Sequence, residues 1–282
     1  MKLASFQHGG RPSWGVVNGD VVFDIGLVLQ GSVPSLTSLL TTQRYAALPA
    51  ALKDAPRWPL AQIMWLPVIP VPGKILCIGV NYEDHRQETG RAEAAHPTIF
   101  ARYASSQTGH LADIERPKRS EKLDFEGELA VIIGKPGRYI SRANAMSHVA
   151  GYACYNDATL RDYQAHTSQF TPGKNFDGTG AFGPWMVTPD EMGRIGPQKI
   201  QTRLNGQVVQ AARLDQMIFD IPRQIEYISS FTRLMPGDVI VTGTPGGVGA
   251  RRQPPLWMKP GDVVEVEIDN VGLLRNQIVA ER

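Results

Sequence analysis

The sequence has few cysteines, no basic run and no long apolar segment. Its 282 residues include two cysteines, Cys77 and Cys154, each within an apolar run. We therefore expect buried free thiols in a reducing cytoplasm and no disulfide framework. The formal net charge is only +2, and the absence of a basic cluster argues against a nucleic-acid surface. No stretch resembles a signal core or is long enough to span a bilayer. The sequence thus predicts a cytoplasmic protein without a nucleic-acid or membrane partner.

Glycine and proline, in contrast, are abundant, with 28 and 21 residues. They separate many short runs rich in β-branched residues, which favours a strand-rich α+β fold. Three prolines, Pro67, Pro70 and Pro72, form a stiff connector. We therefore predict a small N-terminal α+β domain over residues 1–70 and a larger domain over residues 71–282.

Hydrophobic periodicity predicts the main elements. Strands are expected over residues 2–6, 14–17, 21–25, 74–79, 98–101, 125–133, 149–155, 239–241 and 263–268. Helices are expected over residues 36–52, 82–89, 158–166 and 221–231. Asn81 and Asp220 are the expected N-cap residues of the helices that follow them.

Three carboxylates stand out as candidate metal ligands. Glu126 and Glu128 lie two residues apart in a predicted strand, so both side chains extend a face that is otherwise apolar; Asp157 follows the next strand. Burying such groups without a partner would cost several kcal/mol or force protonation. A divalent cation offsets that cost, and oxygen ligands suit Mg²⁺, Mn²⁺ or Ca²⁺. The alternative is a solvated strand end, which the spacing alone favours slightly.

His85 and Glu88 form a second candidate group. Their spacing of three places them on one face of the predicted helix. A carboxylate beside an imidazole fixes its tautomer and makes it a general base. The alternative is a surface histidine with a solvated neighbour.

Two further segments carry polar groups that could serve a site. Lys174 lies on a tight polar loop and could hold an oxyanion, although an exposed lysine is the simpler alternative. The glycine-rich loop 242–249 lacks the Gly-Lys-Ser/Thr ending of a nucleotide-binding loop. Its backbone N–H groups could still bind a small carboxylate, unless the loop merely connects two strands.

Taken together, the motifs resemble the fumarylacetoacetate hydrolase family from about Pro72 to the C-terminus. The resemblance rests on the order of six segments, which are 79–82 with His85 and Glu88, 125–128, 156–164, 173–177, 183–185 and 242–245. It implies a mixed β-roll of the C-terminal type of that family, a homodimer, and a bound Mg²⁺ or Mn²⁺, with Ca²⁺ as a substitute in crystals. By position, the metal ligands would be Glu126, Glu128 and Asp157. The catalytic residues would be His85, Glu88 and Lys174.

The resemblance also implies a function. The expected reaction is hydrolysis of a carbon–carbon bond in a β-diketo acid, an acylpyruvate such as fumarylpyruvate, in the breakdown of aromatic compounds. Substrate-binding residues would be Arg102, Arg161, Gln164 and Thr244. Many relatives carry Lys-Pro where this chain has Arg102-Tyr103, so Arg102 could pair with a second substrate carboxylate or lie on the surface.

Other reactions remain open at such a site. Hydratases, isomerases and oxaloacetate decarboxylases of the family pass through the same kind of enolate. A metal-dependent ligand-binding module without catalysis is a remote alternative, which the His85–Glu88 pair disfavours. Residues 81–95 combine a short helix with a polar tail, so we expect a mobile lid that becomes ordered when a ligand binds.

Overall fold

The chain folds around one large mixed sheet in this computed structural model, which describes residues 1–281. The mixed α+β architecture agrees with the predicted fold class. The sheet has twelve strands, and ten of them form a continuous path. In spatial order these are β4 (Arg57–Pro59), β3 (Val21–Asp24), β2 (Arg11–Asn18), β1 (Lys2–His8), β14 (Gly180–Val187), β12 (Val149–Asp157), β11 (Gly127–Ile133), β17 (Val239–Val241), β6 (Ile75–Gly79) and β7 (Thr98–Arg102). The other two are β5 (Met64–Trp65), which pairs with β1, and β8 (Gln107–Thr108), which pairs with β14.

Two smaller sheets complete the strand framework. The five-stranded sheet has the order β16 (Gln207–Arg213), β15 (Lys199–Leu204), β18 (Val263–Ile268), β19 (Gly272–Ala280) and β9 (Ile114–Arg116). A two-stranded ribbon joins β10 (Leu123–Asp124) to β13 (Thr159–Leu160).

Strand β11 is buried on both faces, which explains its continuous apolar sequence. Leu129 and Val131 pack in one core cluster with Val266 of β18. Ala130 and Ile132 point the other way, into a cluster shared with the N-terminal strands. A carboxylate on this strand is therefore held in apolar surroundings.

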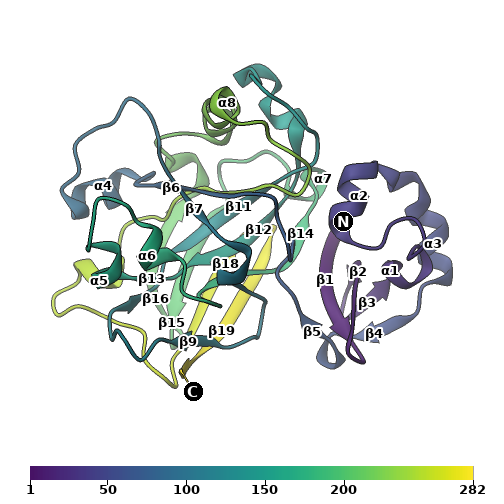
Figure 1. Cartoon of the computed structure of the whole chain (residues 1–282), viewed down its shortest axis with the longest axis horizontal. Helices are drawn as coiled ribbons and strands as arrows, with labels where there is room; N and C mark the ends of the chain where they lie inside the picture. The colour runs from purple at the N-terminus through teal and green to yellow at the C-terminus, as the bar shows by residue number, and fades with distance from the viewer. Residues whose placement is uncertain (282) are drawn as a thin grey trace.

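The helices are short and lie around the sheets (Figure 1). They are α1 (Ile25–Val28), α2 (Leu36–Thr42), α3 (Leu48–Asp54), α4 (Glu83–Thr89), α5 (Arg161–Gln164), α6 (Thr171–Lys174), α7 (Pro189–Met192) and α8 (Ile221–Phe231). Six 3₁₀ turns join them, which are η1 (Arg44–Ala47), η2 (Leu60–Gln62), η3 (Ala104–Ser106), η4 (Arg142–His148), η5 (Leu214–Gln216) and η6 (Gly249–Arg251). Within residues 1–281, no helix has the length and apolar character needed to cross a membrane.

The N-terminal strands continue the large sheet. Strand β1 pairs antiparallel with β14, with Leu3 opposite Met186. Figure 1 shows this part, with α1 to α3, at the right of the molecule. The division at residue 70 stays a prediction, because the sheet and one core cluster run across it.

Three local expectations were wrong. Asn81 does not cap α4: its amide donates to the carbonyl oxygens of Phe219 and Thr242 instead, and Tyr82 is the N-cap residue. The expected helix 158–166 begins as strand β13, because Thr159 and Leu160 pair with β10. The expected helix 36–52 is interrupted at Gln43, whose φ of 54° ends α2. Asp220, however, caps α8 as predicted, accepting a hydrogen bond from Arg223 N at 2.9 Å.

Candidate metal and active site

Glu126, Glu128 and Asp157 converge at the ends of two paired strands. Glu126 immediately precedes β11, Glu128 lies in it, and Asp157 ends β12. The pairing continues past the ladder, since Asp157 N donates to Glu126 O at 2.9 Å. One oxygen from each of these carboxylates lies within 4.8 Å of the other two, and all three residues are buried. We call this group the acidic triad.

The electrostatics of the acidic triad favour a bound cation. Burial, reinforced by Asp157 and Glu126, raises the pKa of Glu128 well above its usual value. Burial likewise raises the pKa of Asp157 against the opposing charges of Lys174 and Arg102. At Glu126 burial also acts to raise the pKa, but Arg161 and Lys174 outweigh it and lower the pKa. The protein's own cations thus leave part of the negative charge uncompensated, and an all-oxygen donor set fits Mg²⁺ or Mn²⁺.

Lys174 lies against the acidic triad at the end of α6. Its Nζ donates to Glu126 Oε2 at 2.6 Å and to Asp157 Oδ2 at 2.5 Å. The side chain is almost fully buried and lies over the ring of Phe100, with Nζ 4.8 Å from the centroid. Burial lowers the pKa of Lys174, but Asp157 and Glu126 outweigh it and raise the pKa. Lys174 therefore stays an ammonium group that can bind an oxyanion.

His85 and Glu88 form a hydrogen-bonded dyad on α4. His85 Nδ1 and Glu88 Oε1 are 2.6 Å apart, and His85 is only 6% exposed. Burial raises the pKa of Glu88, but the bonds from His85 and from the Gly247 backbone outweigh it and lower the pKa. A carboxylate at Glu88 places the proton on His85 Nδ1 and leaves Nε2 free to accept one.

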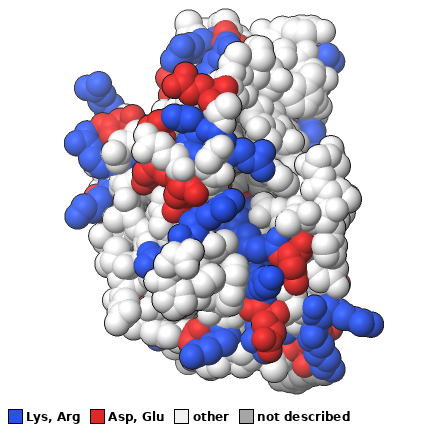
Figure 2. All heavy atoms as spheres, turned by 90° about the vertical axis from the view of Figure 1, so that its left-hand side faces the viewer, with Lys and Arg blue, Asp and Glu red and all other residues white. Residues whose placement is uncertain are grey.

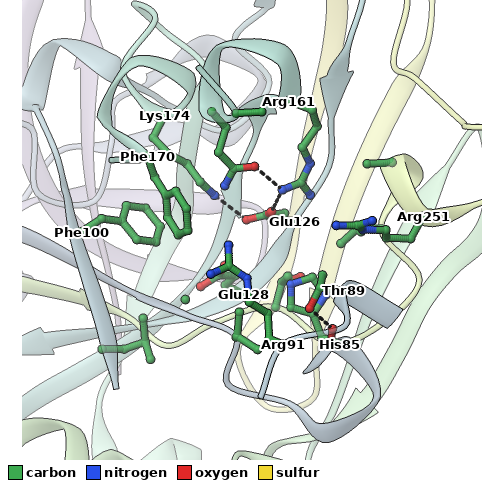
Figure 3. A pocket seen from close by; sticks show the side chains of 18 of the residues that line it. His85, Thr89, Arg91, Phe100, Glu126, Glu128, Arg161, Phe170, Lys174 and Arg251 are labelled. Atoms are coloured by element: carbon green, nitrogen blue, oxygen red, sulfur yellow. Dashed lines mark hydrogen bonds and ion pairs between the residues drawn. The ribbon is translucent and has the colours of Figure 1, made fainter. Parts of the chain in front are cut away.

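Glu126, Glu128, Lys174 and His85 line one cavity of about 430 Å³. Figure 3 shows Lys174 and Glu126 on one side of it and His85 on another. The lining also includes Phe100 and Phe170. The structure thus brings two predicted metal ligands, the lysine and the histidine of the dyad to a single cavity. Asp157 and Glu88 do not line it, but they are hydrogen-bonded to Lys174 and His85.

The glycine-rich loop after β17 binds the chain's own carboxylates. Gly243 N donates to Glu128 Oε2 at 2.5 Å, and Gly247 N donates to Glu88 Oε2 at 2.9 Å. Both glycines have positive φ, 99° and 98°, and a Cβ at Gly243 would lie 2.6 Å from that of Asn81. Only glycine suits these positions. We expected the loop to offer its N–H groups to a small carboxylate, but the structure uses these two to orient a triad residue and a dyad residue.

Asp124 connects the same loop to the acidic triad, and sequence analysis missed it. Its Oδ1 accepts from Gly249 N, and its Oδ2 accepts from Ala250 N and Arg161 Nε, all at 2.8–2.9 Å. Arg161 Nη1 in turn lies 2.6 Å from Glu126 Oε1. Asp124 precedes the strand as an ordinary polar residue, so no spacing signal singled it out.

Replacing Asp124 with asparagine should destabilise the fold by about 3 kcal/mol, because it removes one charge of a buried pair and leaves Arg161 partly uncompensated. Urea unfolding measures the change. Asp215→Asn is a matched control, since Asp215 pairs with Arg213 on the surface, where such pairs contribute about 0–1 kcal/mol. Equal effects of the two substitutions would contradict the role assigned to Asp124.

Three of the four expected substrate-binding residues line the cavity. Arg161, Gln164 and Thr244 line the cavity. Gln164 Oε1 accepts a bond from Arg161 Nη1 at 3.0 Å. Thr244 Oγ1 donates to Gly127 O at 3.0 Å and accepts from Gln210, a residue that sequence analysis missed. Their contacts with a substrate stay predictions.

Arg102 does not line the cavity, which corrects the expected substrate contact. It is 2% exposed and lies behind the acidic triad, where Nη1 donates to Asp157 Oδ1 at 2.5 Å. Its Nη2 donates to Thr179 Oγ1 at 2.8 Å. The guanidinium is therefore already hydrogen-bonded within the protein, where it contacts a carboxylate of the acidic triad.

The proposed lid is anchored at its start and exposed at its end. Asn81, Tyr82 and His85 are buried, and Glu88 is bonded to Gly247. Residues 90–96, in contrast, are exposed. The expectation of little buried area thus fails for the start of the segment and holds for its tail.

Within this segment we therefore expect the fastest hydrogen exchange over residues 92–95 in the ligand-free protein, because these residues are exposed. Adding oxalate and Mg²⁺ should slow their exchange if this tail closes the cavity. Hydrogen–deuterium exchange with mass spectrometry measures both states. Unchanged exchange over residues 92–95 would exclude the tail as a gate.

Comparisons with known proteins agree with this architecture. Residues 74–279 match the family model of the fumarylacetoacetate (FAA) hydrolase C-terminal domain. The mitochondrial oxaloacetate tautomerase FAHD2A of Bos taurus is 37% identical over 289 residues, covering 99% of this chain and 92% of that protein. Maleylpyruvate hydrolase from Sphingobium sp. SYK-6, solved with manganese(II) and pyruvate, superposes with a TM-score of 0.84 at 30% identity, with full coverage of both chains.

A structure of another kind of enzyme is also similar. The 5-carboxymethyl-2-hydroxymuconate delta-isomerase from Mycobacterium smegmatis has a TM-score of 0.80 at 28% identity, again over the full length of both chains. Proteins with this architecture thus carry hydrolase, tautomerase and isomerase names. The match to the family model and the full-length similarity show that the chain belongs to the fumarylacetoacetate hydrolase family.

Proposed function

We propose that the protein is a metal-dependent hydrolase that cleaves the carbon–carbon bond of an acylpyruvate. The observation that supports this most directly is that His85, bonded to Glu88, lines the same cavity as Glu126 and Glu128 of the acidic triad. A metal site alone could serve binding. A histidine oriented by a carboxylate beside it supplies the base that water attack requires.

Each site residue has its own role in the proposed hydrolysis. Glu126, Glu128 and Asp157 would hold the divalent cation, which supplies Lewis acidity toward the 2-oxo acid end of the substrate. His85, oriented by Glu88, would take a proton from a water molecule while the water oxygen bonds to carbon 4, the distal carbonyl carbon. The bond between carbons 3 and 4 would then break, and its electron pair would pass to the pyruvate part as an enolate. Lys174 would donate a hydrogen bond to the enolate oxygen. Protonation of carbon 3 through His85 would complete pyruvate and a carboxylic acid.

Tautomerisation of oxaloacetate is the second candidate, and the full-length similarity to an oxaloacetate tautomerase favours it. His85 could move a proton between the enol oxygen and carbon 3 without adding water. The same base and cation would serve both reactions, so the products distinguish them.

A panel of acylpyruvates that includes fumarylpyruvate tests the proposal. With Mg²⁺ or Mn²⁺ present, the ultraviolet absorbance of the conjugated diketone should fall while pyruvate forms in equal amount. Loss of enol absorbance from oxaloacetate without cleavage of any acylpyruvate would instead support the tautomerase. Tight binding of these acids without any turnover would leave only a binding module.

A homodimer also remains part of the proposal. Large apolar side chains are exposed beside α8, including Tyr139, Phe231 and Met235, and such a patch favours association. Sedimentation of the purified chain measures its oligomeric state.

A further inference from the structure

We propose that Arg91 and Arg251 form a second anion-binding position at the mouth of the cavity, so that the substrate is a dicarboxylate. The inference rests on the proposed function in one respect, which is that the carboxylate of the 2-oxo acid end of the substrate binds at the metal site. It moves the role first expected of Arg102 to two residues that do line the cavity.

Four lysine and arginine side chains line the cavity, and two of them are already paired with carboxylates. Lys174 binds Glu126 and Asp157, and Arg161 binds Asp124 and Glu126. Among residues 1–281, the side chains of Arg91 and Arg251 have neither an acidic partner nor a hydrogen bond; Arg91 has only an aromatic contact, with its Cζ 5.7 Å from the Phe170 ring centroid. Figure 3 shows both side chains directed from the rim toward the cavity.

The balance of charge in the cavity points to a dianion. One divalent cation and the Lys174 ammonium match the three carboxylates of the acidic triad, and Asp124 matches Arg161. The charge of Arg102, which contacts Asp157, is offset in the total by the Glu88 carboxylate. The carboxylate at the metal end of a 2-oxo acid supplies one negative charge. A substrate with a second carboxylate supplies the other charge that two unpaired arginines favour, and the fork of a guanidinium suits carboxylate oxygens.

The backbone holds both arginines in place. The nitrogen of Arg91 donates to Arg86 O at 3.1 Å, and Arg86 Nη1 donates to Arg91 O at 2.8 Å. Arg251 ends η6, whose first two nitrogens donate to Asp124. The two side chains therefore reach the cavity from separate segments, the one after α4 and η6. Figure 2, which faces the side carrying α4 to α6, shows basic and acidic side chains intermixed there, so an extended basic surface does not explain the pair.

A matched pair of ligands tests the inference by binding alone. 2-Oxoglutarate and 2-oxopentanoate have the same chain length and the same 2-oxo acid end, and they differ in the terminal carboxylate. Calorimetric titration of the Mg²⁺-loaded full chain should show at least about tenfold tighter binding of the dianion. Arg91→Gln and Arg251→Gln should each weaken 2-oxoglutarate binding by about fivefold, the upper value for an exposed ion pair. Binding of 2-oxopentanoate should stay unchanged.

Arg233→Gln is the matched control, since Arg233 is exposed and lies outside the cavity lining. It should alter neither affinity. The inference is overturned if wild-type protein binds the two acids equally, if it binds neither, or if the cavity variants lose affinity for both acids alike. A retained preference for the dianion without acylpyruvate turnover would support this inference and reject only the proposed reaction.

Discussion

Removal of the divalent cation should abolish turnover, and Glu126→Gln should weaken metal binding by at least about 100-fold. The divalent cation is the proposed Lewis acid at the 2-oxo acid end of the substrate. Substitution of an outer-shell partner already costs about 10- to 100-fold in metal affinity, so losing a ligand should cost at least the upper value. Glutamine keeps the shape of Glu126 but has a single acceptor oxygen, whereas Lys174 and Arg161 contact different oxygens of Glu126. Chelation followed by titration with Mg²⁺ or Mn²⁺ measures both effects.

The control for this prediction is Glu267→Gln. Glu267 is an acidic residue of β18 in the five-stranded sheet, where it pairs with Arg203 of the neighbouring strand β15. Its substitution should therefore leave metal affinity unchanged. Full activity after exhaustive chelation would reject the metal-dependent mechanism. A Glu126→Gln variant that binds the metal as tightly as the wild type would remove this residue from the ligand set.

His85→Ala should lower kcat by about 10²–10⁴, which is the usual contribution of general acid–base catalysis. This corresponds to about 3–5 kcal/mol of activation free energy. Because the Nδ1 side of the ring is held by Glu88 at 2.6 Å, Glu88→Gln should lower kcat in the same direction. Steady-state kinetics on the best acylpyruvate measures both variants.

Metal affinity provides the control for the dyad, since neither residue belongs to the acidic triad. It should be nearly unchanged in His85→Ala. Hydrolysis at a near-normal rate by this variant would refute the assigned base. Loss of hydrolysis with oxaloacetate tautomerisation retained would show that His85 serves water attack alone.

The grouping of the main site residues follows from sequence, because it depends on local patterns. The spacing of Glu126 and Glu128 in an apolar strand indicated two carboxylates on one face, and the structure places both beside the same cavity. The spacing of His85 and Glu88 predicted a shared helix face, and the two side chains are hydrogen-bonded. Only the family resemblance grouped Asp157 with Glu126 and Glu128, because no local sequence pattern connects Asp157 to the strand that carries the glutamates.

The supporting contacts could not be predicted, because they join residues far apart in the chain. Asp124 receives bonds from a loop 125 residues later, and Gln210 reaches Thr244 from the second sheet. We expected Arg102 to bind a substrate carboxylate because the guanidinium fork suits carboxylate oxygens. Its actual partner, Asp157, is also a carboxylate, so residue type alone could not distinguish the two.

The helix errors have a similar origin. Residues 158–166 have acceptable helical composition, but pairing of Thr159 and Leu160 with β10 overrides that preference. Asn81 suits an N-cap, yet its amide satisfies buried carbonyl groups of two distant segments. In both cases a tertiary contact outweighs a local propensity.

A crystal structure with Mn²⁺ and oxalate, using the anomalous signal of manganese, tests the central claim most directly. The account predicts one manganese ion with Glu126, Glu128 and Asp157 oxygens at roughly 2.0–2.6 Å, oxalate on the same ion, and His85 facing the bound ligand. Manganese located elsewhere, or the three carboxylates turned away from it, would contradict the account.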